Sequence, residues 1–314
     1  MTQSRFMKLV SSKVHLALIL SGCAVLFWLN GVRACWGGQI VNNAVRAWAR
    51  QAIQQEKSLT TRQAAERTLA VLYFHNKTGW NQLKLLQKGL AIMLMTDLSK
   101  VKEIQLVERA RIQALVEELG FGVSGLVLPD QEPRVARLLG ANLVVGGDIV
   151  REHANDFAVQ SGLLNVMTEN MLGKPMVKGK LLDELFRMEK DLLFQIIRLL
   201  KIELSPALEA ELKEPMTGSM DALLHLFGAI EQSDEGHLKD AQDLLDQSLK
   251  EDPDFGLSQG IKGEIAEIFR TDRPAGGGGS SGGGSDIGGI TRKQKECAAL
   301  RNKLRRSSFR RRRF

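Results

Sequence analysis

Three glycines, Gly120, Gly122 and Gly125, have the G-x-G-x-x-G spacing that can cradle the phosphates of a dinucleotide. That chemistry needs the glycines between a strand and the helix that follows it, so that backbone N–H groups face the phosphates. Here a helical pattern precedes the glycines, and no acidic residue stands where a ribose contact would need one. We therefore expect a shaped loop between helices and no bound nucleotide.

Histidine and cysteine are too scattered to form a site from spacing alone. The sequence has no HExxH, GxSxG or Walker A motif, and no CxxC spacing that would indicate zinc. His153 with Asp156 is one candidate pair, but it falls at an expected turn between strands. We expect no enzyme, no cofactor and no metal site. The residues concerned are His15, His75, His153, His225, His237, Cys23, Cys35 and Cys297.

Alternating strand-like and helical patterns must position any functional residue in this chain. Such alternation is typical of α/β architecture, so the expected fold class is α/β, with a mixed sheet packed against helices. The later strands are expected to be antiparallel because short connections join them. The expected strands are 69–74, 104–108, 141–150, 156–166 and 175–180, and the expected helices are 83–98, 109–119, 132–139 and 181–204.

Charged residues on the expected helices are assigned to solvent. Asp97 and Lys100 are placed on the polar side of the first long helix, and Glu117 and Glu118 on a solvated face, since adjacent glutamates diverge. An amphipathic helix is also expected over 42–56. Its apolar stripe would pack either on the α/β body or on a partner.

The net charge of +7 is unevenly distributed along the chain. Residues 274–314 contain eleven Lys and Arg against two acids, and residues 1–34 contain four Lys and Arg against none. The body between them is therefore mildly acidic, and the basic balance is no evidence that it binds nucleic acid.

The amino terminus has the order of a secretory signal. Basic residues precede an apolar run at 14–29, which is short for a membrane span of about 20 residues. We expect residues 1–34 to be a signal peptide cleaved after Ala34. Two alternatives stay open: lipidation of Cys23, which ends the lipobox-like Leu20-Ser21-Gly22-Cys23, and an uncleaved anchor. All three place the body outside the cytoplasm.

The carboxy-terminal part is expected to be helical up to residue 270. Residues 215–270 fit a tetratricopeptide-like hairpin, with small residues at the packing positions. The hairpin would either cap the body or offer a groove to a partner peptide. The candidate partner-binding residues are His225, Ala229, Gln232, Ala241 and Leu245. A Gly/Ser linker, 271–290, and a basic tail, 291–314, follow; the tail has either no role or a contact with an anionic polymer or lipid.

Motifs at the ends of the expected strands and helices resemble those of a known protein family. The stretches TLAVLYFHNKTG, LQKGLAIMLMTDLSKVKEIQLVERARIQALVEELG and RVARLLGANLVVGGDIV resemble the family of the curli secretion component CsgG and the related TolB amino-terminal-like and FlgO-like periplasmic domains. The resemblance covers about 68–205 and gives an α/β domain at 68–214, after an N-terminal helix region at 35–67. Its motifs are structural and include no catalytic residue.

The resemblance implies an exported, non-enzymatic scaffold or assembly protein of the cell envelope, periplasmic or outer-membrane associated. Its expected partners are envelope proteins, including further copies of the chain, with contact to the outer membrane or peptidoglycan; nucleic acid is not expected. The alternative is a periplasmic module that binds cell wall or a small ligand. Segments 120–131 and 167–174 are too short for the membrane hairpins of the curli channel, so we expect the body without the pore.

Overall fold

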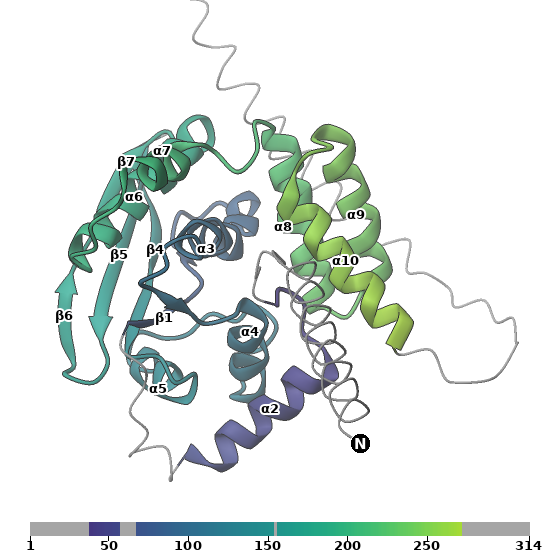
Figure 1. Ribbon diagram of the computed structural model, residues 1–314, viewed down its shortest axis with the longest axis horizontal. Helices are drawn as coiled ribbons and strands as arrows, with labels where there is room; N and C mark the ends of the chain where they lie inside the picture. Colours follow the sequence, from purple (N-terminus) through teal and green to yellow (C-terminus); the bar gives the residue numbers. More distant parts are fainter. Residues whose placement is uncertain (1–37, 57–66, 154–155, 272–314) are drawn as a thin grey trace, which may run out of the picture. The chain divides into compact units, whose positions relative to one another are not determined.

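A mixed sheet is the centre of the computed structural model, which describes residues 38–56, 67–153 and 156–271 (Figure 1). In these residues the sheet has seven strands, neighbouring in the order β3-β1-β4-β5-β6, with β2 also paired to β4 and β7 to β5. The strands are β1 (Thr68–Val71), β2 (His75–Asn76), β3 (Gln105–Leu106), β4 (Leu143–His153), β5 (Asp156–Asn165), β6 (Asn170–Gly173) and β7 (Met176–Gly179). The predicted mixed sheet is confirmed.

The sheet has a parallel half and an antiparallel half that meet at β4. β1 runs parallel to β3 and β4, whereas β5 runs antiparallel to β4, β6 and β7. The residues of β1 are buried throughout, as expected of a strand covered on both faces. The chain turns after β2, where Asn76 Oδ1 accepts from the Thr78 backbone N–H at 3.1 Å and Gly79 takes a φ of 74°.

Helices α3 (Leu85–Leu98) and α6 (Leu181–Leu199) pack against each other, and α6 also contacts β5 and β7. α5 (Glu132–Leu138) packs on β4. One expectation about α3 is wrong: Asp97, assigned to its polar side, is fully buried. The reason is α6, whose Lys190 reaches Asp97 Oδ2, while Lys100 donates to Asp97 Oδ1 at 3.0 Å. Periodicity places a residue on a face, but it does not reveal which helix will cover that face.

The expected amphipathic helix is present as α2 (Asn43–Gln54), which packs on α4 (Arg109–Glu118). Its apolar stripe is therefore used within the chain. The solvated assignment of Glu117 and Glu118 is corrected here: Arg46 pairs with Glu117, and Arg50 Nε lies 3.0 Å from Glu118 Oε1. Both glutamates help to hold α2 on α4.

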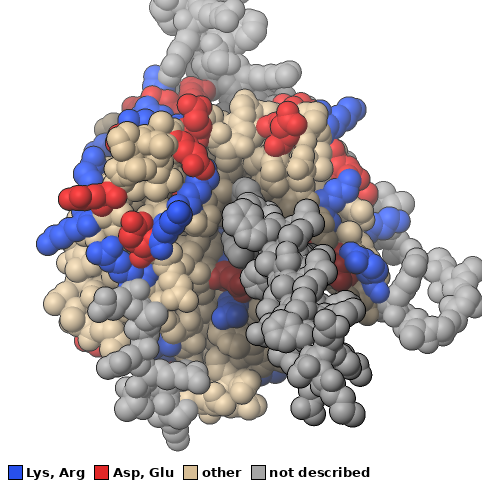
Figure 2. Space-filling model, in the orientation of Figure 1, with Lys and Arg blue, Asp and Glu red and all other residues tan. Residues whose placement is uncertain are grey.

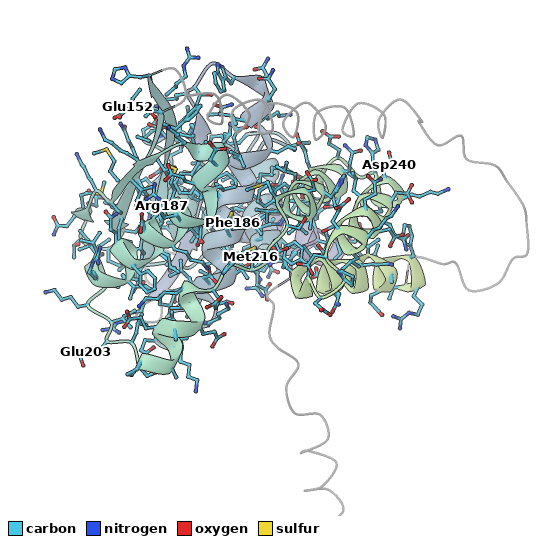
Figure 3. All side chains as sticks on the ribbon, turned by 90° about the horizontal axis from the view of Figure 1, so that it is seen from above. Glu152, Phe186, Arg187, Glu203, Met216 and Asp240 are labelled. Atoms are coloured by element: carbon cyan, nitrogen blue, oxygen red, sulfur yellow. The ribbon has the colours of Figure 1, made fainter. Side chains whose placement is uncertain are left out.

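The carboxy-terminal helices are α7 (Pro206–Lys213), α8 (Met220–Asp234), α9 (Leu238–Glu251) and α10 (Gly256–Thr271). α8 and α9 form the expected hairpin around Gly236, whose φ is 84°, and α10 packs on α9. Figure 3 labels Met216 on the segment that joins the sheet part to this hairpin, and Asp240 on the hairpin itself. The likeness of the hairpin to a tetratricopeptide repeat stays a prediction.

β6, α7 and the short β2, whose residues were expected in a turn, were not predicted from the sequence. β6 was expected to be a simple connection, yet it pairs with β5 through registers such as Leu164↔Met171. α7 lies beyond the helix expected at 181–204, and no helix was predicted at 206–213. The signal for α7 was present, because Ser205 accepts from the Leu208 N–H at 3.2 Å and Pro206 occupies the first turn.

The close contact between α3 and α8 depends on Gly89. A Cβ at this position would overlap the Phe227 ring, which is itself buried. We expect Gly89→Ala to destabilise the chain by about 1–3 kcal/mol, because the ring must move in a packed core. Gly263→Ala on the exposed side of α10 is the matched control, since nothing lies within 4 Å of its Cβ. Urea unfolding followed by circular dichroism measures both; equal midpoints would contradict the close-packing argument.

Candidate docking groove

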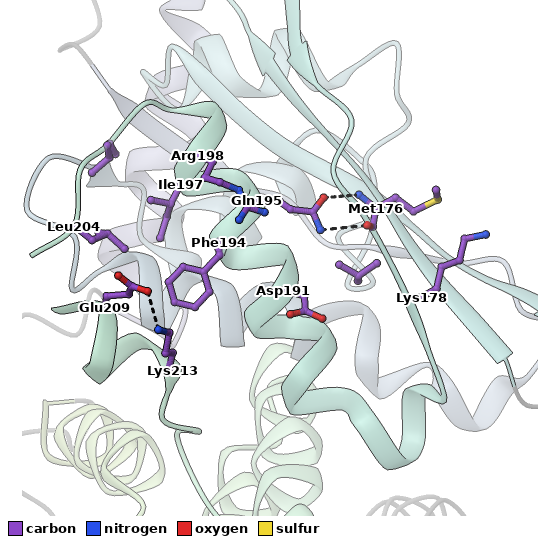
Figure 4. Close-up of a pocket in the computed structure, with 12 residues that line it drawn as sticks. Met176, Lys178, Asp191, Phe194, Gln195, Ile197, Arg198, Leu204, Glu209 and Lys213 are labelled. Atoms are coloured by element: carbon purple, nitrogen blue, oxygen red, sulfur yellow. Dashed lines mark hydrogen bonds and ion pairs between the residues drawn. The ribbon is translucent and has the colours of Figure 1, made fainter. Parts of the chain in front are cut away.

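A groove of about 670 Å³ runs along α6, with β7 on one side and α7 on the other (Figure 4). Its floor is one exposed stripe of α6, at the i, i+3, i+4, i+7 spacing of a single helical face. Its walls come from β7, from the segment before α7 and from α7. The docking groove is lined by Met176, Val177, Lys178, Asp191, Phe194, Gln195, Ile197, Arg198, Ile202, Leu204, Glu209 and Lys213.

The wall at β7 is a sheet edge. Within the described residues β7 pairs with β5 alone, through registers from Phe157↔Gly179 to Gln160↔Met176. Ser161 N–H donates to the Pro175 carbonyl at 2.9 Å, so backbone groups at 175 face β5. Because successive residues of a strand alternate, the backbone groups of Met176 and Lys178 face away from β5, toward α6.

Side chains of α6 occupy most of these outward backbone groups. Gln195 Oε1 accepts from Met176 N–H at 3.2 Å, and Gln195 Nε2 donates to the Met176 carbonyl at 3.2 Å (Figure 4). Arg187 Nη2 donates to the Lys178 carbonyl at 2.9 Å. The edge is therefore satisfied by side chains, in the positions where a neighbouring strand would bond.

The charges of the docking groove are partly paired. Lys213 Nζ lies 2.7 Å from Glu209 Oε1, Asp191 pairs with Arg187, and Lys178 Nζ lies 2.6 Å from Glu152 Oε1. Two cations differ. Among the described residues no carboxylate lies within ion-pair distance of Arg198, nor of Lys174 in the adjoining 280 Å³ cavity.

The surface around the docking groove carries both signs of charge. In Figure 2 acidic and basic side chains are interspersed over the upper left of the molecule, where Figure 1 places α6 and α7. The docking groove therefore lies in no broad field of one sign, and Arg198 and Lys174 are the local cations without an ion-pair partner among the described residues.

A second cluster joins the sheet part to the helical hairpin. Arg109, at the start of α4, is fully buried and donates from Nη2 to Asp234 Oδ1 at 2.8 Å and from Nη1 to Tyr73 Oη at 3.0 Å. Lys88 Nζ donates to Asp234 Oδ2 at 2.6 Å and to the Val123 carbonyl at 2.7 Å. We call Tyr73, Lys88, Arg109 and Asp234 the buried ion-pair cluster.

Burial and charge act against each other on Asp234. Burial disfavours the carboxylate, but Arg109 and Lys88 outweigh it and hold the pKa of Asp234 below its usual value. Burial lowers the pKa of Lys88, and the negative charge of Asp234 only partly offsets this effect. The depressed pKa of Asp234 contributes stability that is present above the pKa of the unfolded chain and is lost as the pH falls through the folded value.

Glu132 is a described carboxyl group whose pKa lies in the range useful for acid–base chemistry at neutral pH. Burial, with the charge of Asp148, raises its pKa to about 7. Its carboxylate lies over Gly146, where a Cβ would come within 2.8 Å of Oε1. The neighbouring charge is already engaged, because Lys77 Nζ lies 2.8 Å from Asp148 Oδ2. The ring of His75 is engaged with the backbone, because its Nε2 is 2.8 Å from the Val127 carbonyl.

The residues proposed for partner binding on the hairpin lie mostly inside it. Ala229, Gln232, Ala241 and Leu245 are buried, and His225 is half-buried. Their residue types therefore serve helix packing in this conformation, and their role in partner binding stays a prediction. Cys23 and Ala34, with the linker beyond residue 271 and the basic tail, lie outside the described residues.

The glycine-rich segment is a loop, as expected. Gly120, Gly122 and Gly125 all have positive φ, and a Cβ at Gly125 would overlap the Tyr73 ring. His153 and Asp156 face each other across β4 and β5 and are exposed. The docking groove was missed by sequence reasoning. The available signal was the spacing of Asp191, Phe194, Gln195 and Arg198 after the strand expected at 175–180.

The structure is therefore an α/β domain with a helical appendage, and side chains of α6 cover the edge of its sheet at β7. Residues 49–156 match the model of the family described as the curli production assembly/transport component CsgG. The CsgG-like character expected from the sequence is thereby confirmed for this segment. The docking groove and the hairpin lie beyond the matched residues.

The C-terminal domain of LpoB from Salmonella enterica is 16% identical to this chain, over 43% of this chain and 95% of that one, with a TM-score of 0.30. No curated protein matches the chain. Within the described residues, no helix combines the length and apolar character needed to cross a membrane.

Proposed function

We propose that this protein is a non-enzymatic scaffold or assembly protein of the bacterial cell envelope, which docks partners through its α/β body and its helical hairpin. The observation that carries the proposal is the CsgG family match at 49–156. The docking groove supports it, because its lining consists of apolar and charged side chains beside a strand edge that only side chains cover, and it suits a protein segment.

The amino-terminal pattern and the family match together support the proposed location. A basic start, an apolar run and a cleavage site with Val32 and Ala34 at its −3 and −1 positions are typical of export. Mass spectrometry of the mature protein decides between cleavage after Ala34, lipidation of Cys23 and a retained anchor. Recovery of the mature chain in the cytosol would contradict the envelope assignment.

Crosslinking of envelope fractions, followed by affinity purification of the tagged chain, tests the function. We expect discrete protein complexes that contain the chain, because a scaffold must hold its partners. The alternative function is a module that binds cell wall or a small ligand, and the size of the docking groove lies within the usual range for small-ligand sites. Retention on purified peptidoglycan without protein partners would favour that alternative and overturn the scaffold.

A further inference from the structure

We propose that the docking groove binds an extended, acidic segment of a partner protein, which pairs with β7 as an additional strand and displaces Gln195. The inference rests on the proposed function, since it names the kind of partner segment that the α/β body docks. It depends on three observations: the position of a helix beside a strand edge, the way that edge is satisfied, and the charges at one end of the groove.

The first observation is geometric. A strand edge facing a helix across a groove is a general arrangement for strand addition, in which backbone bonds supply affinity and alternate side chains enter the groove. β7 provides the edge, α6 faces it, and the lining includes the partly buried Phe194. The outward groups of Met176 and Lys178 lie two residues apart, which is the spacing that a neighbouring strand uses.

The second observation is how the edge is protected. The carboxamide of Gln195 makes one donor and one acceptor contact with Met176, as the backbone of a paired residue would. Both distances, 3.2 Å, are at the long end of the normal range for such bonds. Gln195 is part of the groove surface, so water can solvate its carboxamide once it swings away. An incoming strand therefore exchanges long side-chain bonds for backbone bonds.

The third observation selects the sign of the partner. Arg198 and Lys174 are exposed, and no carboxylate among the described residues lies within ion-pair distance of either. Arg198 lines both the docking groove and the adjoining cavity, so the two cations meet where these join. Carboxylates of an incoming segment would find two partners there, whereas a basic segment such as 291–314 would be repelled.

Selection from a displayed library of random twelve-residue peptides tests the proposal on the full mature chain. We expect enriched peptides to be acidic and to alternate apolar with polar residues. A synthetic copy of one such peptide should bind at least about tenfold more weakly to the double variant Arg198→Glu, Lys174→Glu. N-methylation of alternate peptide amides should weaken binding by a similar factor, because it removes strand-pairing donors.

Two control variants make the test specific. Lys239→Glu with Lys250→Glu reverses two exposed charges on α9 and should leave peptide affinity unchanged, which separates the local charge from the net charge. Gln195→Ala should bind the peptide as well as the unmodified chain or better, because only the Arg187 contact with the Lys178 carbonyl then has to be displaced. A loss of binding in Gln195→Ala would contradict the displacement step.

The inference and the proposed function can fail separately. The inference is overturned if selection enriches no acidic peptide. It is also overturned if the affinity of the selected peptides is unchanged by Arg198→Glu, Lys174→Glu and by N-methylation. If envelope complexes then persist, the scaffold function stands and uses another surface. If acidic peptides bind at the docking groove but crosslinking recovers only peptidoglycan, the scaffold function fails and the groove assignment stands.

Discussion

Asp234→Asn is expected to lower the free energy of unfolding by about 3–5 kcal/mol, because it leaves the charges of Arg109 and Lys88 buried without their anion. Arg109 is fully buried, and Asp234 is its carboxylate partner in the described residues. The remaining acceptors of Arg109, the Gln39 carbonyl and the Tyr73 hydroxyl, are neutral. Neither can replace the lost charge.

The loss should appear first where α8 meets the sheet part. We expect limited proteolysis to cut the joining segment around Met216 faster in Asp234→Asn than in the unmodified chain, because the hairpin is held less firmly. Urea unfolding followed by circular dichroism measures the size of the effect. A variant in which both Arg109 and Asp234 become apolar should recover part of the stability, since no charge is then left buried.

Asp246→Asn is the matched control for this experiment. It removes the carboxylate of an exposed ion pair with Lys262 on neighbouring helices α9 and α10. Exposed pairs contribute between zero and about 1 kcal/mol. Equal effects of Asp234→Asn and Asp246→Asn would show that the buried ion-pair cluster does not hold the hairpin on the sheet part.

The elements with strong periodicity were predictable from the sequence, and the short ones were not. The pattern of apolar residues located α3, α4, α8 and α9, because apolar side chains recur through several turns of each, although α3 and α8 are buried on nearly every side. β6 has four residues, and its Met171 and Leu172 are exposed, so no alternation marks it as a strand. Its existence depends on pairing with β5, which is a property of the folded chain.

The candidate site could be predicted only in part, because residues that contact each other in the fold lie far apart in the sequence. Arg109 and Asp234 are 125 residues apart, and each alone has the pattern of a solvated helix residue. The same applies to Asp97, whose burial depends on the approach of α6. Charged residues are rarely buried without partners, so sequence reasoning assigns them to solvent and is wrong where two helices bring opposite charges together.

The docking groove depends on register as well as on proximity. Gln195 reaches Met176 because residue 176 has its backbone groups turned away from β5. A shift of one residue in the pairing of β5 and β7 would turn those groups toward β5 and expose the groups of the adjacent residues instead, so Gln195 would lose its partner. The sequence indicated a strand at 175–180 and a helix after it, but the register is set by the β5–β7 pairing.

The buried carboxyl of Glu189 makes the stability of the sheet part depend on pH. Burial, with the charge of the neighbouring Asp97, raises its pKa to about 8, and Lys190 Nζ lies 3.5 Å from its Oε2. The folded chain therefore favours the neutral acid. Stability from this group is fully present below the pKa of the unfolded chain, near 4.5, and is lost as the pH rises through about 8.

Glu189→Gln keeps the shape of the neutral acid and removes its ionisation. At pH 8 we expect the variant to be about 2–4 kcal/mol more stable than the unmodified chain, and near pH 4.5 we expect little difference. Urea unfolding at a series of pH values measures the change in slope. Glu203→Gln, at an exposed carboxyl on the surface (Figure 3), is the control and should follow the unmodified chain throughout. A Glu189→Gln curve parallel to the unmodified one would show that Glu189 is ionised in the folded chain, paired with Lys190.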